Sequence, residues 1–182
     1  VFLLGFMMLL VQVEFLSFAF AKLGFSPTLG MSVLMLSLVG SIINLPVTRL
    51  KSNIPIPENM RSNHWGLLKI PLSSFRNETQ VSINLGGCLI PAALSMYLFA
   101  NSTLTLIPTL LGISIISLIS YLFSRPVQGI GIGMPILIAP ISAAFVSLLI
   151  SPEQSAPLAY ISGTMGVLIG ADLLHLKDIP KL

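Results

Sequence analysis

Asp172 and His175 are the residues best suited to chemistry, because a carboxylate and an imidazole lie near the end of an otherwise apolar stretch, 163–176. A carboxylate in such a setting can form an ion pair at the membrane boundary or take part in acid–base catalysis. Ionisable residues within apolar segments are costly, and they often mark functional sites. We therefore take Asp172 as a hypothetical catalytic residue and His175 as a hypothetical binding residue.

Four other polar residues interrupt apolar stretches, and we treat them as hypothetical pocket or intramembrane residues: Glu14, Asn44, Asn84 and Arg125. Asparagines in such positions commonly hydrogen-bond between helices. The long side chain of Arg125 or of Arg49 can reach Asp172 and pair with it at the membrane boundary. Glu14 lies about 12 Å from the helix end marked by Lys22, near mid-membrane, where we expect it to be protonated. Its depth differs from that of Asp172 by about 10 Å, which excludes a shared-proton pair of the two carboxylates.

The composition indicates an integral membrane protein. Hydrophobic residues make up 54% of the chain and charged residues only 8%, with a mean hydropathy of +0.96, whereas soluble domains are roughly 25% charged. The formal charge is +3, and in so apolar a chain the basic residues are best explained as setting its orientation in the membrane. We do not expect nucleic-acid binding. The single cysteine, Cys88, excludes an internal disulfide, and His64, Asp172 and His175 supply too few ligands for a metal. We expect no metal and no cofactor.

The predicted fold class is all-α, with about six transmembrane helices in a single domain over residues 1–182. A span needs about 20 apolar residues, and the sequence offers such stretches at 1–23, 27–47, 81–100, 104–123, 129–150 and 157–176. The third and fourth spans, joined by a minimal turn, are expected to form a tight antiparallel pair. The glycine-rich opening of the fifth span is not expected to be regular helix. The chain can be a fragment of a longer protein, truncated at both ends.

The distribution of basic residues predicts the orientation. Eight of the nine Lys and Arg residues lie in the polar loop 49–80, at Arg125 and after the sixth span, and all of these segments share one side of the membrane. The positive-inside rule therefore places the 49–80 loop and both visible termini in the cytoplasm. We expect this loop to lie on the membrane surface, with Trp65 at headgroup depth.

Helical spacing predicts two different faces for the sixth span. At 100° per residue, Gly163, Gly166 and Gly170 share a face suited to close packing, while Asp172 and His175 are neighbours on nearly the opposite face. The irregular ends of spans two, three, five and six also fall at the same cytoplasmic depth. Irregular backbone at membrane depth needs protein or water to satisfy its polar groups, so we predict a cytoplasm-facing polar pocket around Asp172.

The residues at 160–176 and 125–131, with Asn84-Leu85-Gly86-Gly87 and Pro91, are similar to an uncharacterised prokaryotic membrane family, domain of unknown function 1614. The resemblance covers about Gly24 to Leu182. It implies a multi-pass protein of a prokaryotic plasma membrane with no established activity. It also implies a continuation with a Gly-rich segment that carries another aspartate.

Three functions are consistent with these features. The protein can be a structural subunit of a membrane complex, with a homo-oligomer or other subunits as partners besides the lipid bilayer. It can be part of a presenilin-like intramembrane aspartyl protease, because Asp172 ends the sixth span in the matching leaflet, although Ala171 replaces the expected tyrosine. It can be a small-solute or ion transporter with broken helices in two oppositely oriented halves.

Overall fold

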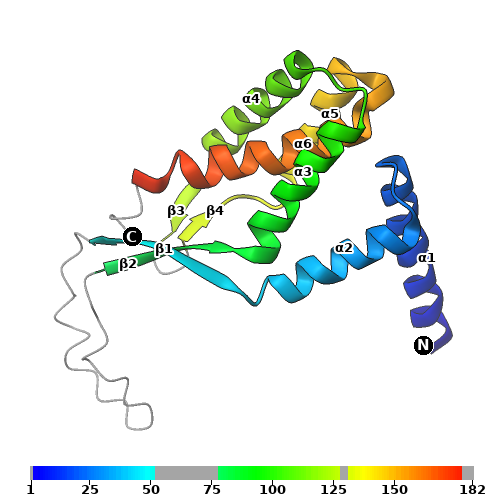
Figure 1. The fold of residues 1–182 in the computed structure, drawn as a ribbon. Helices are drawn as coiled ribbons and strands as arrows, with labels where there is room; N and C mark the ends of the chain where they lie inside the picture. Colours follow the sequence, from blue (N-terminus) through cyan, green and yellow to red (C-terminus); the bar gives the residue numbers. More distant parts are fainter. Residues whose placement is uncertain (1, 52–77, 128–130, 178–182) are drawn as a thin grey trace, which may run out of the picture.

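Helices form most of the described part of the chain in a computed structural model, which describes residues 2–51, 78–127 and 131–177 (Figure 1). The α-helices are α1 (Phe2–Lys22), α2 (Pro27–Gly40), α3 (Ile90–Asn101), α4 (Leu106–Phe123), α5 (Ile138–Ile150) and α6 (Ser155–Val167). Two π-helical segments, η3 (Leu85–Leu89) and η5 (Leu168–Leu173), precede α3 and follow α6, and a 3₁₀ turn, η4 (Pro152–Gln154), precedes α6. The predicted helical character is confirmed.

Three helical stretches of the described chain are long and apolar enough to cross a membrane: Gly5–Lys22, Leu106–Phe123 and Pro152–Leu173. The apolar helices at Pro27–Gly40, Leu85–Asn101 and Ile138–Ile150 are shorter. The prediction of about six spans therefore holds for three of them by helix length. The other three are shorter because extended backbone replaces the helix at one of their ends.

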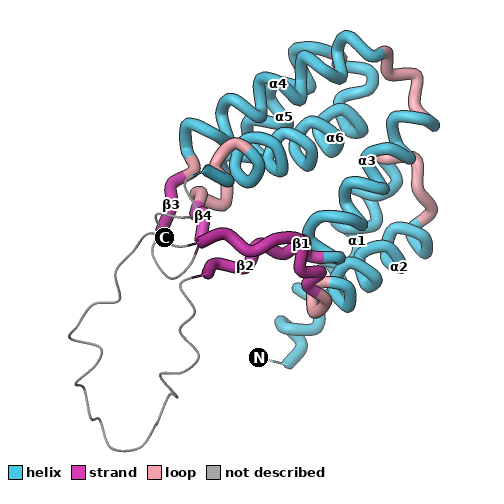
Figure 2. The backbone as a smooth tube through the Cα atoms, turned by 60° about the vertical axis from the view of Figure 1, so that its left-hand side comes forward, coloured by secondary structure: helices cyan, strands magenta, loops and turns pink. Residues whose placement is uncertain are grey.

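That extended backbone forms two antiparallel ribbons, which an all-α prediction missed. Strands β1 (Asn44–Lys51) and β2 (Glu78–Asn84) pair with each other, as do β3 (Arg125–Val127) and β4 (Gly131–Gly133). The ribbons lie at the same end of the helices, which we call the ribbon end (Figures 1 and 2). Prolines and glycines favour extended backbone here, because a proline inside a helix loses a hydrogen bond and glycine is a poor helix former. The rest of the 49–80 loop, with Trp65, lies outside the described residues.

Helix α6 is the centre of the packing. It lies between α3 and α4 and also packs on α5 (Figure 1). The side chains of Leu158 in α6 and Ile116 in α4 are fully buried. The predicted tight pair of the third and fourth spans is wrong, because α3 and α4 scarcely touch. Ser102 and Thr105 at their junction are extended, so the connection separates the two helices and leaves room for α6.

Helix α1 stands at the edge of the molecule and packs on α2 (Figure 1). Gly24 joins the two helices with a φ of +83°, a left-handed conformation that glycine adopts without steric cost. The next residue, Phe25, is buried and stacks on Tyr97 of α3 with ring centroids 5.6 Å apart. This stack ties the α1–α2 turn to the end of α3.

Candidate functional site

Glycines allow the sixth span to pack closely on α4 and α5, as the predicted glycine face requires. A Cβ on Gly166 would lie 2.7 Å from the Cβ of Ile116 in α4, and one on Gly170 would meet the carbonyl oxygen of Ser117. At Gly163 a Cβ would lie 3.3 Å from that of Ala143 in α5. The glycine face is therefore shared between α4 and α5, with the closest approach at Gly170.

Asp172 and His175, which were predicted to share a helix face, lie in two different environments. Asp172 is exposed on η5, whereas the side chain of His175 is 6% exposed and tilts over the ring of Tyr121, with centroids 4.7 Å apart. The Nδ1 atom of His175 lies 3.3 Å from the carbonyl oxygen of Gly170. The prediction that His175 shares the face opposite the glycines is wrong, because the helix widens to π geometry at Leu168 and ends at Leu173, which changes the angular spacing of the residues that follow.

Among the side chains that the structure describes, which do not include that of Arg49, no charged group supports the Asp172 carboxylate. Arg125, the other predicted ion-pair partner, is exposed at the start of β3 and pairs with Gly133 through the backbone. Glu14 is exposed on α1, on the far side of the molecule from η5 (Figure 1). The structure therefore brings neither residue to Asp172. The thiol of Cys88 in η3 lies within electrostatic reach of the Asp172 carboxylate.

Asn44 and Asn84, by contrast, are brought together. They are partners in the β1–β2 register, and the Asn84 Nδ2 donates hydrogen bonds to the Asn44 Oδ1 at 2.9 Å and to the carbonyl oxygen of Ser41 at 2.6 Å. The Oδ1 of Asn84 accepts from the backbone N–H of Gly87 at 2.6 Å and so caps η3. The expected bonding between helices is found at Asn84, which joins Ser41 at the C-cap of α2 to the start of η3. Asn44 instead bonds to Asn84 at the end of the β1–β2 ribbon.

Close backbone contact also joins η3 to the end of α2. A Cβ on Gly86 would meet the Ser37 carbonyl oxygen and the Ser41 nitrogen, and would lie 2.9 Å from the Gly40 carbonyl carbon. The Ser37 hydroxyl donates to the Gly86 carbonyl at 2.6 Å. A side chain larger than glycine cannot be accommodated at position 86 without separating α2 from η3.

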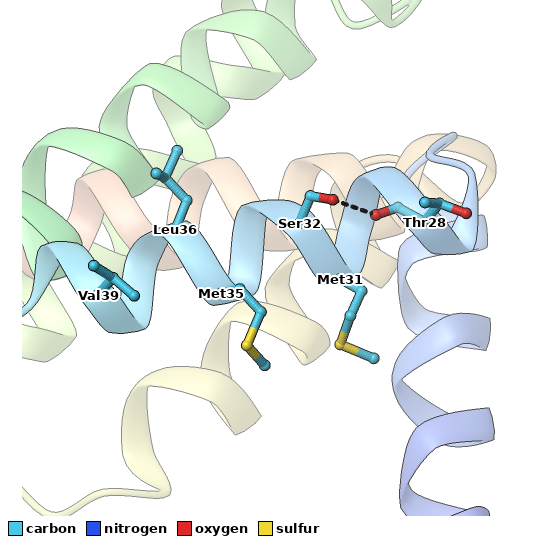
Figure 3. Close-up of a pocket in the computed structure, with 6 residues that line it drawn as sticks. All are labelled: Thr28, Met31, Ser32, Met35, Leu36 and Val39. Atoms are coloured by element: carbon cyan, nitrogen blue, oxygen red, sulfur yellow. Dashed lines mark hydrogen bonds between the residues drawn. The ribbon is translucent and has the colours of Figure 1, made fainter.

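Two hollows of the described surface are not lined by Asp172, so neither supports the predicted polar pocket there. One is an open apolar groove along α2, where Met31 and Met35 project from the same side of the helix (Figure 3). Ser32 is the polar residue at its centre, and its hydroxyl already donates to the Thr28 carbonyl at 2.8 Å. The other hollow is polar but is built from α1, α3 and η4 at the end opposite the ribbons. The described residues also contain no group of three His, Cys, Asp or Glu side chains able to hold a metal.

Two residues next to the candidate residues were not singled out by the sequence. Tyr121 supplies the ring under His175, and the thiol of Cys88 in η3 lies within electrostatic reach of the Asp172 carboxylate. Tyr121 lies within an apolar helix, and its pairing with His175 depends on how α4 and η5 pack. A single cysteine in an apolar run likewise gives no sequence signal for a neighbouring carboxylate.

These features define a mostly helical protein with apolar helices of membrane-spanning length and an exposed aspartate where its last described helix ends. The chain belongs to the family described as "Protein of unknown function (DUF1614)", whose model matches residues 38–182. The predicted resemblance is thereby confirmed, with a match that begins at residue 38 rather than at Gly24. No curated protein and no solved structure matches the chain.

Proposed function

We propose that this protein is a multi-pass protein of the cell membrane that acts as a subunit of a membrane complex and docks a partner at Asp172. The observation that carries the proposal is an exposed carboxylate on the last turn of a helical stretch that is apolar enough to span a membrane. Lipid chains cover apolar side chains well, but a carboxylate at this depth needs a polar or charged partner.

The surroundings of Asp172 favour a protein partner. Leu173 and Leu174, which follow it, are 57% and 47% exposed, so the carboxylate lies next to exposed apolar side chains. A second membrane helix that carries a hydrogen-bond donor or a cation would cover the leucines and pair with the carboxylate in one contact. The partner can be a second copy of this chain or another subunit.

The orientation follows from the basic residues. Arg125 and Lys177 lie at the same end of the helices as Asp172, and the positive-inside rule assigns an end with such an excess to the cytoplasm. The proposed contact therefore lies in the cytoplasmic leaflet.

Purification in a mild detergent tests the assembly. We expect the wild-type protein to elute with a stoichiometric partner or as an oligomer, and Asp172→Leu to elute alone. Glu14→Leu is the matched control, because Glu14 is also an exposed carboxylate on an apolar helix but lies on α1. A wild-type monomer, or an assembly that survives Asp172→Leu, would contradict the proposal.

An intramembrane aspartyl protease is the second candidate. It is favoured by the same exposed carboxylate, which no described cation neutralises and which a second carboxylate about 3 Å away would convert into a proton-sharing pair. Asp178, the next acidic residue, lies outside the described residues. The full-length protein should then cleave a transmembrane peptide, and Asp172→Asn should abolish cleavage while leaving assembly intact. Cleavage by Asp172→Asn would rule out this candidate.

A transporter is supported less well. The transporter hypothesis requires broken helices in two halves of opposite orientation. The two similar units of the described chain are instead α2–β1–β2–α3 and α4–β3–β4–α5, and both have their ribbon at the same end (Figure 1). Binding sites made from broken helices lie near the middle of the membrane, whereas these breaks lie at one end of the helices.

A further inference from the structure

A polar hollow lies at the end of the helices opposite the ribbons, where three separate parts of the chain meet (Figure 1). Its volume is about 420 Å³, within the range of about 300–1,000 Å³ typical of small-molecule sites. The end of α1 contributes Lys22, the end of α3 contributes Tyr97 and Asn101, and the η4–α6 junction contributes Glu153, Gln154 and Ser155.

The polar groups of this hollow retain bonding capacity. The Asn101 Nδ2 donates to the carbonyl oxygen of Tyr97 at 2.9 Å, which leaves its Oδ1 as an acceptor. The Lys22 ammonium lies 5.4 Å from the centroid of the Phe18 ring, and a contact with a ring face leaves N–H donors free for a ligand.

The two charges have opposite signs and come from different walls. Lys22 ends α1, while Glu153 lies in η4 between α5 and α6. A ligand with only a negative charge would gain from Lys22 but be repelled by Glu153, and a purely cationic ligand would meet the reverse. A ligand that carries both charges gains from both walls.

We propose that this hollow binds a zwitterionic group that carries an ammonium and an anionic oxygen group a few bonds apart. Lys22 binds the anionic group, Glu153 binds the ammonium, and the Asn101 and Gln154 carboxamides orient the ligand. This chemistry occurs in a phosphoethanolamine lipid headgroup and in a free α-amino acid. The hollow lies where the apolar helices end, which is the depth of lipid headgroups in a membrane.

Isothermal titration of the full chain in detergent micelles tests the proposal with three probes. Short-chain phosphatidylethanolamine carries both charges, short-chain phosphatidylglycerol carries the phosphate without the ammonium, and L-alanine represents the free amino acid. We expect at least one zwitterion to bind about tenfold more tightly than phosphatidylglycerol, the ratio expected for one charge-assisted hydrogen bond.

Three variants assign the contacts. Glu153→Gln should remove the preference for the zwitterion over phosphatidylglycerol, and Lys22→Gln should weaken binding of every probe by about tenfold. Both side chains are exposed, so we expect both variants to fold. Lys177→Gln, which removes an exposed lysine at the other end of the helices, should bind as the wild type does.

The outcomes separate the two ligand sources and include failure of the proposal. Binding of phosphatidylethanolamine alone identifies a lipid headgroup, and binding of L-alanine identifies a free amino acid. Equal binding of phosphatidylglycerol, no binding of either zwitterion, or unchanged binding by both Lys22→Gln and Glu153→Gln would overturn the proposal. Because the hollow lies far from Asp172, its failure leaves the proposed assembly at the ribbon end unaffected.

Discussion

The two π-helical segments, η3 and η5, each use a glycine to bring two backbone segments into close contact. Each places a glycine where a Cβ would meet the backbone of a neighbouring segment: Gly86 on the end of α2, and Gly170 on Ser117 of α4. Both lie toward the ribbon end, η3 directly after β2 and η5 at the end of α6 (Figure 1). π-Helical turns are rare and are frequent at functional sites, so the presence of two makes their differences informative.

The segments differ in how their polar groups are satisfied. Asn84 begins η3, and both ends of its carboxamide are used, toward Gly87 on one side and toward Ser41 and Asn44 on the other. Asp172 in η5 is exposed and has no described cation beside it. The η3 turn is therefore a complete structural joint, whereas the Asp172 carboxylate of η5 has no partner among the side chains that the structure describes. This contrast makes η5, and not η3, the better candidate for function.

The largest expected effect comes from filling the glycine contacts. Gly170→Ala and Gly86→Ala should each lower the free energy of unfolding by about 3 kcal/mol or more, because the added methyl meets backbone that cannot rotate away. Thermal unfolding in detergent measures the change. Gly5→Ala is the control, since no atom lies within 4 Å of its added Cβ. If Gly86→Ala were tolerated while Gly170→Ala were not, the two turns would not share a packing role.

A smaller effect is expected from the cap of η3. Asn84→Ala removes the cap and two further hydrogen bonds, and should cost about 2 kcal/mol of stability. Asn44→Ala removes a single bond from this group and should cost about 1 kcal/mol. The difference in thermal midpoint between the two variants measures the cap of η3 together with the bond from Asn84 to Ser41. Equal midpoints would show that these two bonds contribute nothing.

The smallest effect on stability is expected at Asp172. Asp172→Asn keeps the size of the side chain and removes a charge that no described cation supports, so the free energy of unfolding should change by less than about 0.5 kcal/mol. Asp172→Asn should nevertheless abolish any cleavage of a transmembrane peptide, whereas loss of assembly is expected of Asp172→Leu, as proposed above. The same thermal unfolding assay, run beside Asn84→Ala, makes the comparison. A large destabilisation by Asp172→Asn would make η5 a structural joint like η3.

Periodicity predicted the helices better than the strands. Long apolar stretches identified α1, α4 and the α6–η5 stretch, because a helix satisfies its own backbone and needs only its own residues. The ribbons were missed because each joins segments distant in sequence, such as Asn44 and Asn84, and such pairing leaves little trace in local composition. For the candidate site, residue type marked Asp172 and His175, but it indicated neither that Asp172 would be exposed nor that His175 would be buried against Tyr121.

The sequence alone determined the apolar character of the chain, its family, the glycine face of the last helix and the unusual position of Asp172. These features depend on residue type and local spacing. Only the tertiary structure decided that α6 separates α3 from α4 and that Asn84 bonds to Asn44. It also decided that the His175 ring packs on Tyr121 and not beside Asp172. The physical reason is that close glycine contacts decide which helices touch, and the π-helical turn that follows changes which way the next side chains point. Spacing along an ideal helix contains neither piece of information.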